Sequence, residues 1–66
     1  MRIRVNGDPF ELAGPKTLLE LLEDLNIDPR RVAVEHNLTI VKRDRYATTT
    51  IGEGDEVEIV NFVGGG

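Results

Sequence analysis

A short amphipathic helix with a clear beginning is the feature that most constrains how this chain can fold. Thr17-Leu18-Leu19-Glu20 has the pattern of a capping box, in which the threonine oxygen accepts a backbone hydrogen bond and Glu20 reaches back. The leucines that follow recur at i, i+3, i+4 and i+7 and form one apolar stripe: Leu18, Leu21, Leu22 and Leu25. A stripe on one side of a helix needs a second layer to cover it, so the sequence predicts a helix packed on a sheet.

The residues after the stripe predict where this helix ends. Asn26 tolerates the left-handed conformation that commonly follows a helix, and Ile27 can pack back on the last turn. Pro29 prevents the helix from continuing. The helix should therefore have about two turns.

Alternating apolar residues predict a hairpin at the start of the chain. Residues 1–5 alternate arginine with apolar residues, which is the period of a half-buried strand. Asn6-Gly7 is a strong signal for a tight turn, and residues 10–13 alternate again before Gly14-Pro15. We expect the second strand to return antiparallel to the first.

The second half of the chain predicts three further strands. Residues 32–36 and 39–41 are joined by a turn at Asn37-Leu38, and residues 56–63 follow a tight turn around Gly54-Asp55. The resulting order of elements indicates an α+β fold, with a mixed sheet of four to five strands and one main helix packed on one face. We assign residues 1–63 to this domain.

The last predicted strand is apolar on both of its faces. Val57, Ile59 and Val63 share one face, whereas Val60 and Phe62 share the other, where a solvent-facing strand should be polar. A central strand covered on both sides would explain this pattern, but one short helix can cover only one face of a small sheet. We therefore favour an exposed apolar patch that contacts a partner.

The chain offers little for catalysis or metal binding. It contains no serine and no cysteine, so neither a disulfide nor a Ser-His or Cys-His pair can form. The single histidine, His36, falls at a predicted strand end and is expected to be a surface or turn residue. Residues 42–46 predict a loop or one helical turn, with Tyr46 as a partly buried plug. We expect no bound metal and no enzymatic activity.

The net charge of −4 argues against nucleic acid or anionic lipid as the main partner. Glu53, Asp55, Glu56 and Glu58 are grouped before the end of the chain, where the favoured interpretation is a solvated strand edge. The alternative is that they guide this end toward a basic partner, and we include Glu56 and Glu58 in a candidate docking surface with Val60 and Phe62. No apolar stretch reaches the length of a membrane span, and we expect a cytoplasmic protein.

The sequence ends on three glycines, Gly64, Gly65 and Gly66. Without a Cβ atom, such a flexible tail can enter a channel too narrow for side chains, and it presents the carboxylate of Gly66 to a partner enzyme. A carboxylate must be activated before it reacts, most simply by ATP to an acyl-adenylate. The activated acyl group can then accept sulfur to give a thiocarboxylate, or an amine to give an isopeptide.

Five segments together resemble the ubiquitin-like β-grasp proteins of the ThiS/MoaD family, and within it the ThiS sulfur carriers. They are the opening strand with Asn6-Gly7, the capped helix of residues 17–22, and residues 32–37, 54–60 and 62–66. The resemblance covers essentially the whole chain, and its last two segments are the most specific. MoaD carriers share the fold and the tail, but this chain is short for them.

The resemblance implies a substrate of other enzymes. A ThiF-like, E1-like adenylyltransferase would adenylate Gly66 with ATP, and sulfur derived from a cysteine desulfurase would convert it to a thiocarboxylate. A ThiG-like thiazole synthase would then take the sulfur for the thiazole moiety of thiamine. The chain itself would bind no cofactor. The alternatives are a MoaD-like carrier for molybdopterin synthesis, a ubiquitin-like protein modifier, and a non-covalent interaction module.

Overall fold

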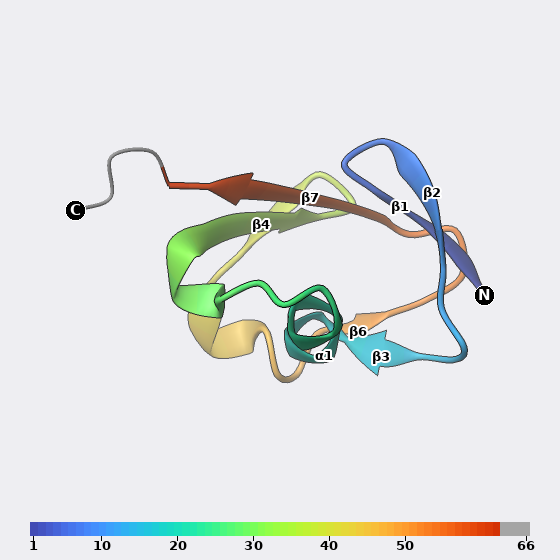
Figure 1. Cartoon of the computed structure of the whole chain (residues 1–66), viewed down its shortest axis with the longest axis horizontal. Helices are drawn as coiled ribbons and strands as arrows, with labels where there is room; N and C mark the ends of the chain where they lie inside the picture. Colours follow the sequence, from blue (N-terminus) through green and yellow to red (C-terminus); the bar gives the residue numbers. More distant parts are fainter. Residues whose placement is uncertain (63–66) are drawn as a thin grey trace.

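Seven strands, one α-helix and two 3-10 turns make up the computed structural model, which describes residues 1–62 (Figure 1). In chain order they are β1 (Arg2–Val5), β2 (Asp8–Glu11), β3 (Lys16–Thr17), α1 (Leu18–Asp24), η1 (Pro29–Arg31), β4 (Val32–His36), β5 (Thr39–Val41), η2 (Arg43–Arg45), β6 (Thr50–Ile51) and β7 (Glu56–Asn61).

Five of the strands form one mixed sheet in the order β2-β1-β7-β4-β5. Strand β7 lies in the centre, parallel to β1 and antiparallel to β4, and pairs Val60 with Ala33 and Val57 with His36. The predicted mixed sheet of four to five strands with one helix is therefore confirmed, and it has five strands. The strand pair β3-β6 was not predicted, because each strand has only two residues and carries no measurable alternation.

Both predicted ends of the helix are confirmed. The Oγ1 of Thr17 accepts from the Glu20 backbone N–H at 3.1 Å, and the Glu20 Oε1 accepts from the Thr17 N–H at 2.9 Å. After the helix, Asn26 has φ 58° and the Ile27 N–H donates to the Leu22 carbonyl oxygen at 2.9 Å. This bond, together with one from Asn26 to Glu23, forms a Schellman motif that satisfies the last carbonyl groups.

Both predicted hairpin turns are present, and they share one backbone conformation. Asn6 and Gly7 have φ of 52° and 84°, and Asn37 and Leu38 have φ of 51° and 69°. Positive φ at both central residues is the feature of a type I′ turn, whose twist matches that of the flanking strands. These turns set the register of β2 on β1 and of β5 on β4.

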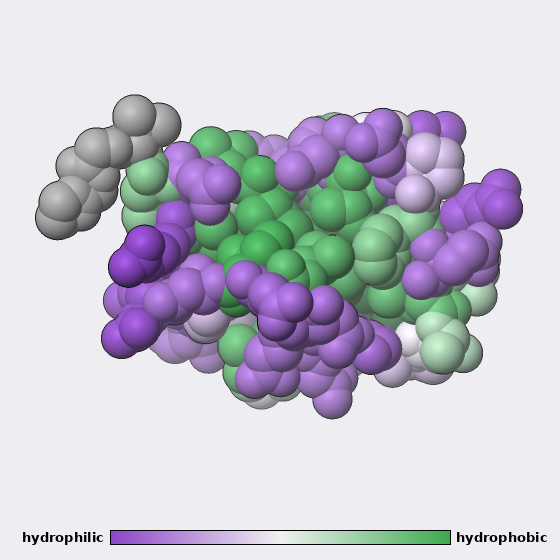
Figure 2. Space-filling model, viewed as in Figure 1, coloured by the Kyte–Doolittle hydropathy of each residue, from purple (hydrophilic) through white to green (hydrophobic). Residues whose placement is uncertain are grey.

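The core lies between the helix and one face of the sheet. From the side shown in Figure 2, apolar side chains gather between α1 and strands β4 and β7, bordered by polar residues. The buried residues are Ile3, Leu12, Leu18, Leu21, Leu22, Val32, Val34, Tyr46, Ile51 and Val57. Tyr46 is only 2 % exposed and its hydroxyl donates to the Val32 carbonyl oxygen at 3.3 Å, so it is more deeply buried than predicted.

Candidate functional site

The end of β7 sets the position from which the C-terminal segment leaves the fold. The strand ends at Asn61, and the backbone N–H of Phe62 then donates to the carbonyl oxygen of Arg31 at 2.9 Å. This end of the central strand lies at the left of Figure 1, beside η1. The predicted reacting residue Gly66 and the tail residues Gly64 and Gly65, together with Val63, lie outside the described residues.

The outer face of β7, opposite the helix, carries the four residues of the candidate docking surface. Val57 and Ile59 face the core, and the alternate residues Glu56, Glu58, Val60 and Phe62 are exposed. Val60 is 61 % exposed and Phe62 is 58 % exposed. One interpretation of the apolar pattern was a central strand covered on both faces. Strand β7 is central, but only one of its faces is covered. The role of these residues in docking stays a prediction.

Further apolar side chains lie on the same outer face. Ala33 of β4 is paired with Val60, and Ile40 of β5 lies opposite Glu35, which is itself paired with Glu58. Ile40 is 74 % exposed. The sequence analysis assigned Ile40 no role, although its exposure follows from alternation in a strand whose next residue, Val41, faces inward. Each of these three strands therefore contributes an apolar side chain to the outer face, which also carries the carboxylates Glu35 and Glu58.

Most of the grouped carboxylates lie away from the tail. Glu53 and Asp55 come before β7, and Glu56 begins it, so these residues sit at the opposite end of the strand from Phe62. At about 3.3 Å per residue, Glu56 and Phe62 are about 20 Å apart. Glu53 also accepts from the backbone N–H of Arg2 at 3.1 Å. Proximity in sequence to the glycines therefore does not place these three carboxylates at the tail.

His36 and Asp55 form a structural pair at this distant end. The His36 Nε2 lies 2.7 Å from the Asp55 Oδ2, which also accepts from the Gly52 N–H at 2.7 Å. Burial, the largest single influence, raises the pKa of Asp55, but the hydrogen bonds from Gly52, His36 and Asn37 outweigh it and hold the pKa below its ordinary value. His36 is at a strand end, as predicted, yet it is mostly buried and linked to the Asp55 turn.

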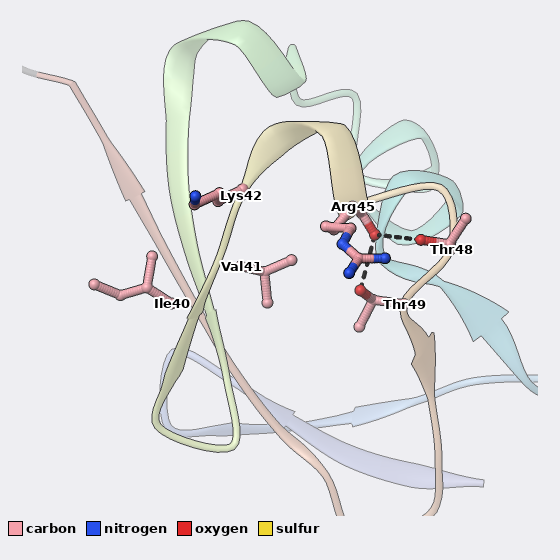
Figure 3. A pocket seen from close by; sticks show the side chains of 6 residues that line it. All are labelled: Ile40, Val41, Lys42, Arg45, Thr48 and Thr49. Atoms are coloured by element: carbon pink, nitrogen blue, oxygen red, sulfur yellow. Dashed lines mark hydrogen bonds between the residues drawn. The ribbon is translucent and has the colours of Figure 1, made fainter.

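Two hollows adjoin η2, whose Arg43 lines one and whose Arg45 lines the other. The smaller, of about 280 Å³, is lined by Phe62 and Arg43 together with Pro29, Val32, Ala33, Val41 and Tyr46. The wider one, of about 420 Å³, is drawn in Figure 3 and is lined by residues from β5 through Thr49.

The donors around the wider hollow do not converge. Thr48 and Thr49 both donate their hydroxyl protons to the Arg45 carbonyl oxygen, and Lys42 points to the opposite side of β5 from Arg45 (Figure 3). A phosphate site needs several donors aimed at one point. The wider hollow therefore does not have the arrangement of a phosphate site.

The described part of the chain shows no arrangement of metal ligands. Within residues 1–62, histidine and carboxylate side chains nowhere gather in a group of three that could hold an ion. Over the same residues, no helix has the length and apolar character needed to cross a membrane.

Comparison with known proteins identifies the family. The family model described as the ThiS family matches residues 3–66. The chain belongs to the ThiS family. Its match to the sulfur carrier protein ThiS of Escherichia coli is 30 % identical over 66 residues and covers 100 % of both chains. The resemblance inferred from the sequence segments is thereby confirmed.

A solved ThiS structure and longer relatives extend this comparison. The crystal structure of the thiamine biosynthesis protein ThiS from Geobacter metallireducens superposes with a TM-score of 0.88, at 36 % identity and full coverage of both chains. A thiazole synthase of Paramagnetospirillum magneticum is 42 % identical over 66 residues, which are 100 % of this ThiS-family chain and 20 % of that protein. The chain thus spans about a fifth of the length of the thiazole synthases that it matches.

Proposed function

We propose that this ThiS-family chain is a sulfur carrier for the synthesis of the thiazole moiety of thiamine. The observation that carries the proposal is the family match through residue 66, which includes the three glycines that follow the end of the central strand after Phe62 and Val63. The E. coli relative is named a sulfur carrier protein, and the longer relatives are named thiazole synthases. These names favour thiazole synthesis over molybdopterin synthesis as the destination of the sulfur.

The reacting group in this proposal is the carboxylate of Gly66. A ThiF-like adenylyltransferase joins a carboxylate oxygen to the α-phosphate of ATP and releases pyrophosphate. Sulfur from a cysteine desulfurase-derived persulfide then replaces AMP at the acyl carbon, and cleavage of the sulfur-sulfur bond by a thiol leaves the thiocarboxylate. A ThiG-like thiazole synthase consumes this product. The reaction requires that Gly66 carries a free carboxylate.

The short tail requires the folded body to dock close to the active site of its partner. Three extended glycines span only about 10 Å. We propose that the exposed residues Val60 and Phe62 make this contact, with Glu56 and Glu58 further along the same face. Apolar side chains that stay exposed on a monomer are typical of such interfaces.

The direct test is to supply the chain with ATP, its activating enzyme and a sulfur donor, and to trap the product with an alkylating reagent. Peptide mapping must place the adduct on Gly66, because exchange of oxygen for sulfur resembles oxidation of Met1 in mass. Omission of ATP and deletion of Gly65 and Gly66 are the controls, and both should abolish the adduct. Absence of an adduct from the intact chain would refute the carrier function, and isopeptide-linked products would indicate a protein modifier instead.

A further inference from the structure

The end of the molecule from which the C-terminal segment leaves is cationic, although the chain as a whole is anionic. Strand pairing brings η1 and η2 to this end, because Val32 lies opposite Asn61 and Arg43 lines the same hollow as Phe62. Five of the eight lysines and arginines are in or beside these two turns: Arg30, Arg31, Lys42, Arg43 and Arg45. Asp28 and Asp44 are the carboxylates of the same two turns.

Three of these cations are not neutralised within the described residues. Asp28 is engaged with Arg30, at 2.9 Å from its Nη2, and lies 3.8 Å from the Nε of Arg31. Within residues 1–62, no salt bridge joins Lys42, Arg43 or Arg45 to a carboxylate, and all three are exposed.

Screening makes this local charge more important than the net charge of −4. Charges are largely screened beyond about 8 Å at physiological ionic strength. The carboxylates at the start of β7 are about 20 Å from Phe62, which is more than two such lengths. A partner that receives the tail therefore meets the cations of η1 and η2 and is little affected by Glu53, Asp55 and Glu56.

The smaller hollow adds an apolar feature at the same place. Its volume of about 280 Å³ is just below the range of small-molecule pockets, which begins at about 300 Å³. It is lined mainly by apolar or aromatic side chains, with Arg43 beside them. A hollow of this size and composition suits one apolar side chain of a protein partner, flanked by a carboxylate that pairs with Arg43.

We infer that the ATP-using enzyme that activates Gly66 binds this end through an acidic surface and inserts one apolar side chain into the hollow beside Phe62. This inference rests on the proposed function. In the proposed function the activating enzyme is the first partner that receives the tail, and because the tail spans only about 10 Å, the enzyme surface around it lies against the cations of η1 and η2. An acidic surface there would attract these cations, and the carboxylates at the start of β7 are too distant to oppose this attraction.

The role of the cationic residues in binding is tested by two charge-reversal substitutions that change the net charge by the same amount. Arg43→Glu acts at the tail end, and Arg2→Glu, whose side chain is also exposed, acts near the acidic end. Pyrophosphate release by the activating enzyme gives KM and kcat for each carrier variant at low and high salt. We expect Arg43→Glu to raise KM about tenfold at low salt, with kcat little changed and a smaller effect at high salt. Arg2→Glu should change KM less than twofold.

The role of the hollow in binding is tested by a substitution that fills it. Ala33 is exposed and lines the hollow, so Ala33→Leu should occupy it without disturbing the core, whereas Ala13→Leu adds the same atoms outside it. We expect Ala33→Leu to raise KM about tenfold at both salt concentrations and Ala13→Leu to leave KM unchanged. Thermal unfolding of each variant should stay close to that of the parent chain.

Equal effects of the two charge reversals, or an unchanged KM for Arg43→Glu or Ala33→Leu, would overturn the inference. These outcomes are separate from failure of the proposed function. If the parent chain itself forms no ATP-dependent adduct at Gly66, the carrier function fails. If the parent chain reacts but the paired variants do not differ, only the binding surface is wrong.

Discussion

The backbone N–H of Phe62 donates to the carbonyl oxygen of Arg31 at 2.9 Å, which holds the last described residue against the turn that precedes β4. This bond extends the pairing of β7 with β4 by one step beyond Asn61. It places the exposed aromatic ring of Phe62 at a defined position beside the cationic turns η1 and η2. The point from which the proposed reacting tail leaves is therefore part of the folded sheet.

We expect Phe62→Asp to weaken binding of the activating enzyme by about tenfold or more, because central aromatic residues often dominate interfaces. The isolated fold should persist, because the side chain is 58 % exposed and the backbone bond to Arg31 remains. Calorimetric titration measures the affinity, and Leu38→Asp is the matched control at an exposed site in the distant β4–β5 turn. Unchanged affinity, or global unfolding of the variant, would refute the docking role of Phe62.

Thr17→Ala should lower the free energy of unfolding by about 1 kcal/mol. The substitution removes the oxygen that accepts from the Glu20 N–H at the start of α1. Urea denaturation measures the loss, and Thr17→Ser should retain most of the stability because serine is at least as good an N-cap. Equal stability of the alanine and serine variants would show that the capping box contributes little.

Asp28 should make folding sensitive to acid. The side-chain hydrogen bond from Arg30, followed by the Arg30 backbone N–H, lowers the pKa of Asp28 from 3.8 to about 2. A carboxylate with a lowered folded-state pKa contributes stability above its unfolded pKa, and this contribution is lost as the pH falls from about 4 to 2. Asp28→Asn keeps an oxygen that accepts from Arg30 but has no titrating charge. The variant should therefore lose less stability than the parent chain as the pH falls from about 4 to 2. Thermal melts from pH 6 to pH 2 test the difference, and parallel curves would contradict it.

Tyr46 should make folding sensitive to alkali. Burial raises the pKa of the Tyr46 phenol above its ordinary value of 10.0. A raised folded-state pKa means that stability present below pH 10 is lost as the pH rises toward the folded-state value. Tyr46→Phe should remove this alkaline loss. Because Tyr46 is the only tyrosine and the chain has no tryptophan, its ionisation can be followed directly by ultraviolet absorbance. Ionisation of the folded chain at its ordinary pKa would contradict the prediction.

The sequence alone determined the elements whose causes are local. The capping residues Thr17 and Glu20, the left-handed residue Asn26 and the turn residues Asn6-Gly7 act on neighbours a few positions away, so their roles could be inferred without a fold. The alternation of residues 56–62 also predicted correctly that Val60 and Phe62 face away from the residues that pack in the core. The three glycines and the segments before them were sufficient to indicate the ThiS family.

The tertiary structure alone decided which charges surround the point where the chain leaves the sheet. Along the sequence, Glu56 is nearer to the glycines than Arg43, but an extended strand carries Glu56 about 20 Å from Phe62, whereas pairing of β4 with β5 and β7 returns Arg43 to the same hollow as Phe62. The burial of Tyr46 and the β3-β6 pair depend on the same long-range packing. Contacts between distant segments arise from strand pairing, and neither composition nor local periodicity records which strands will pair.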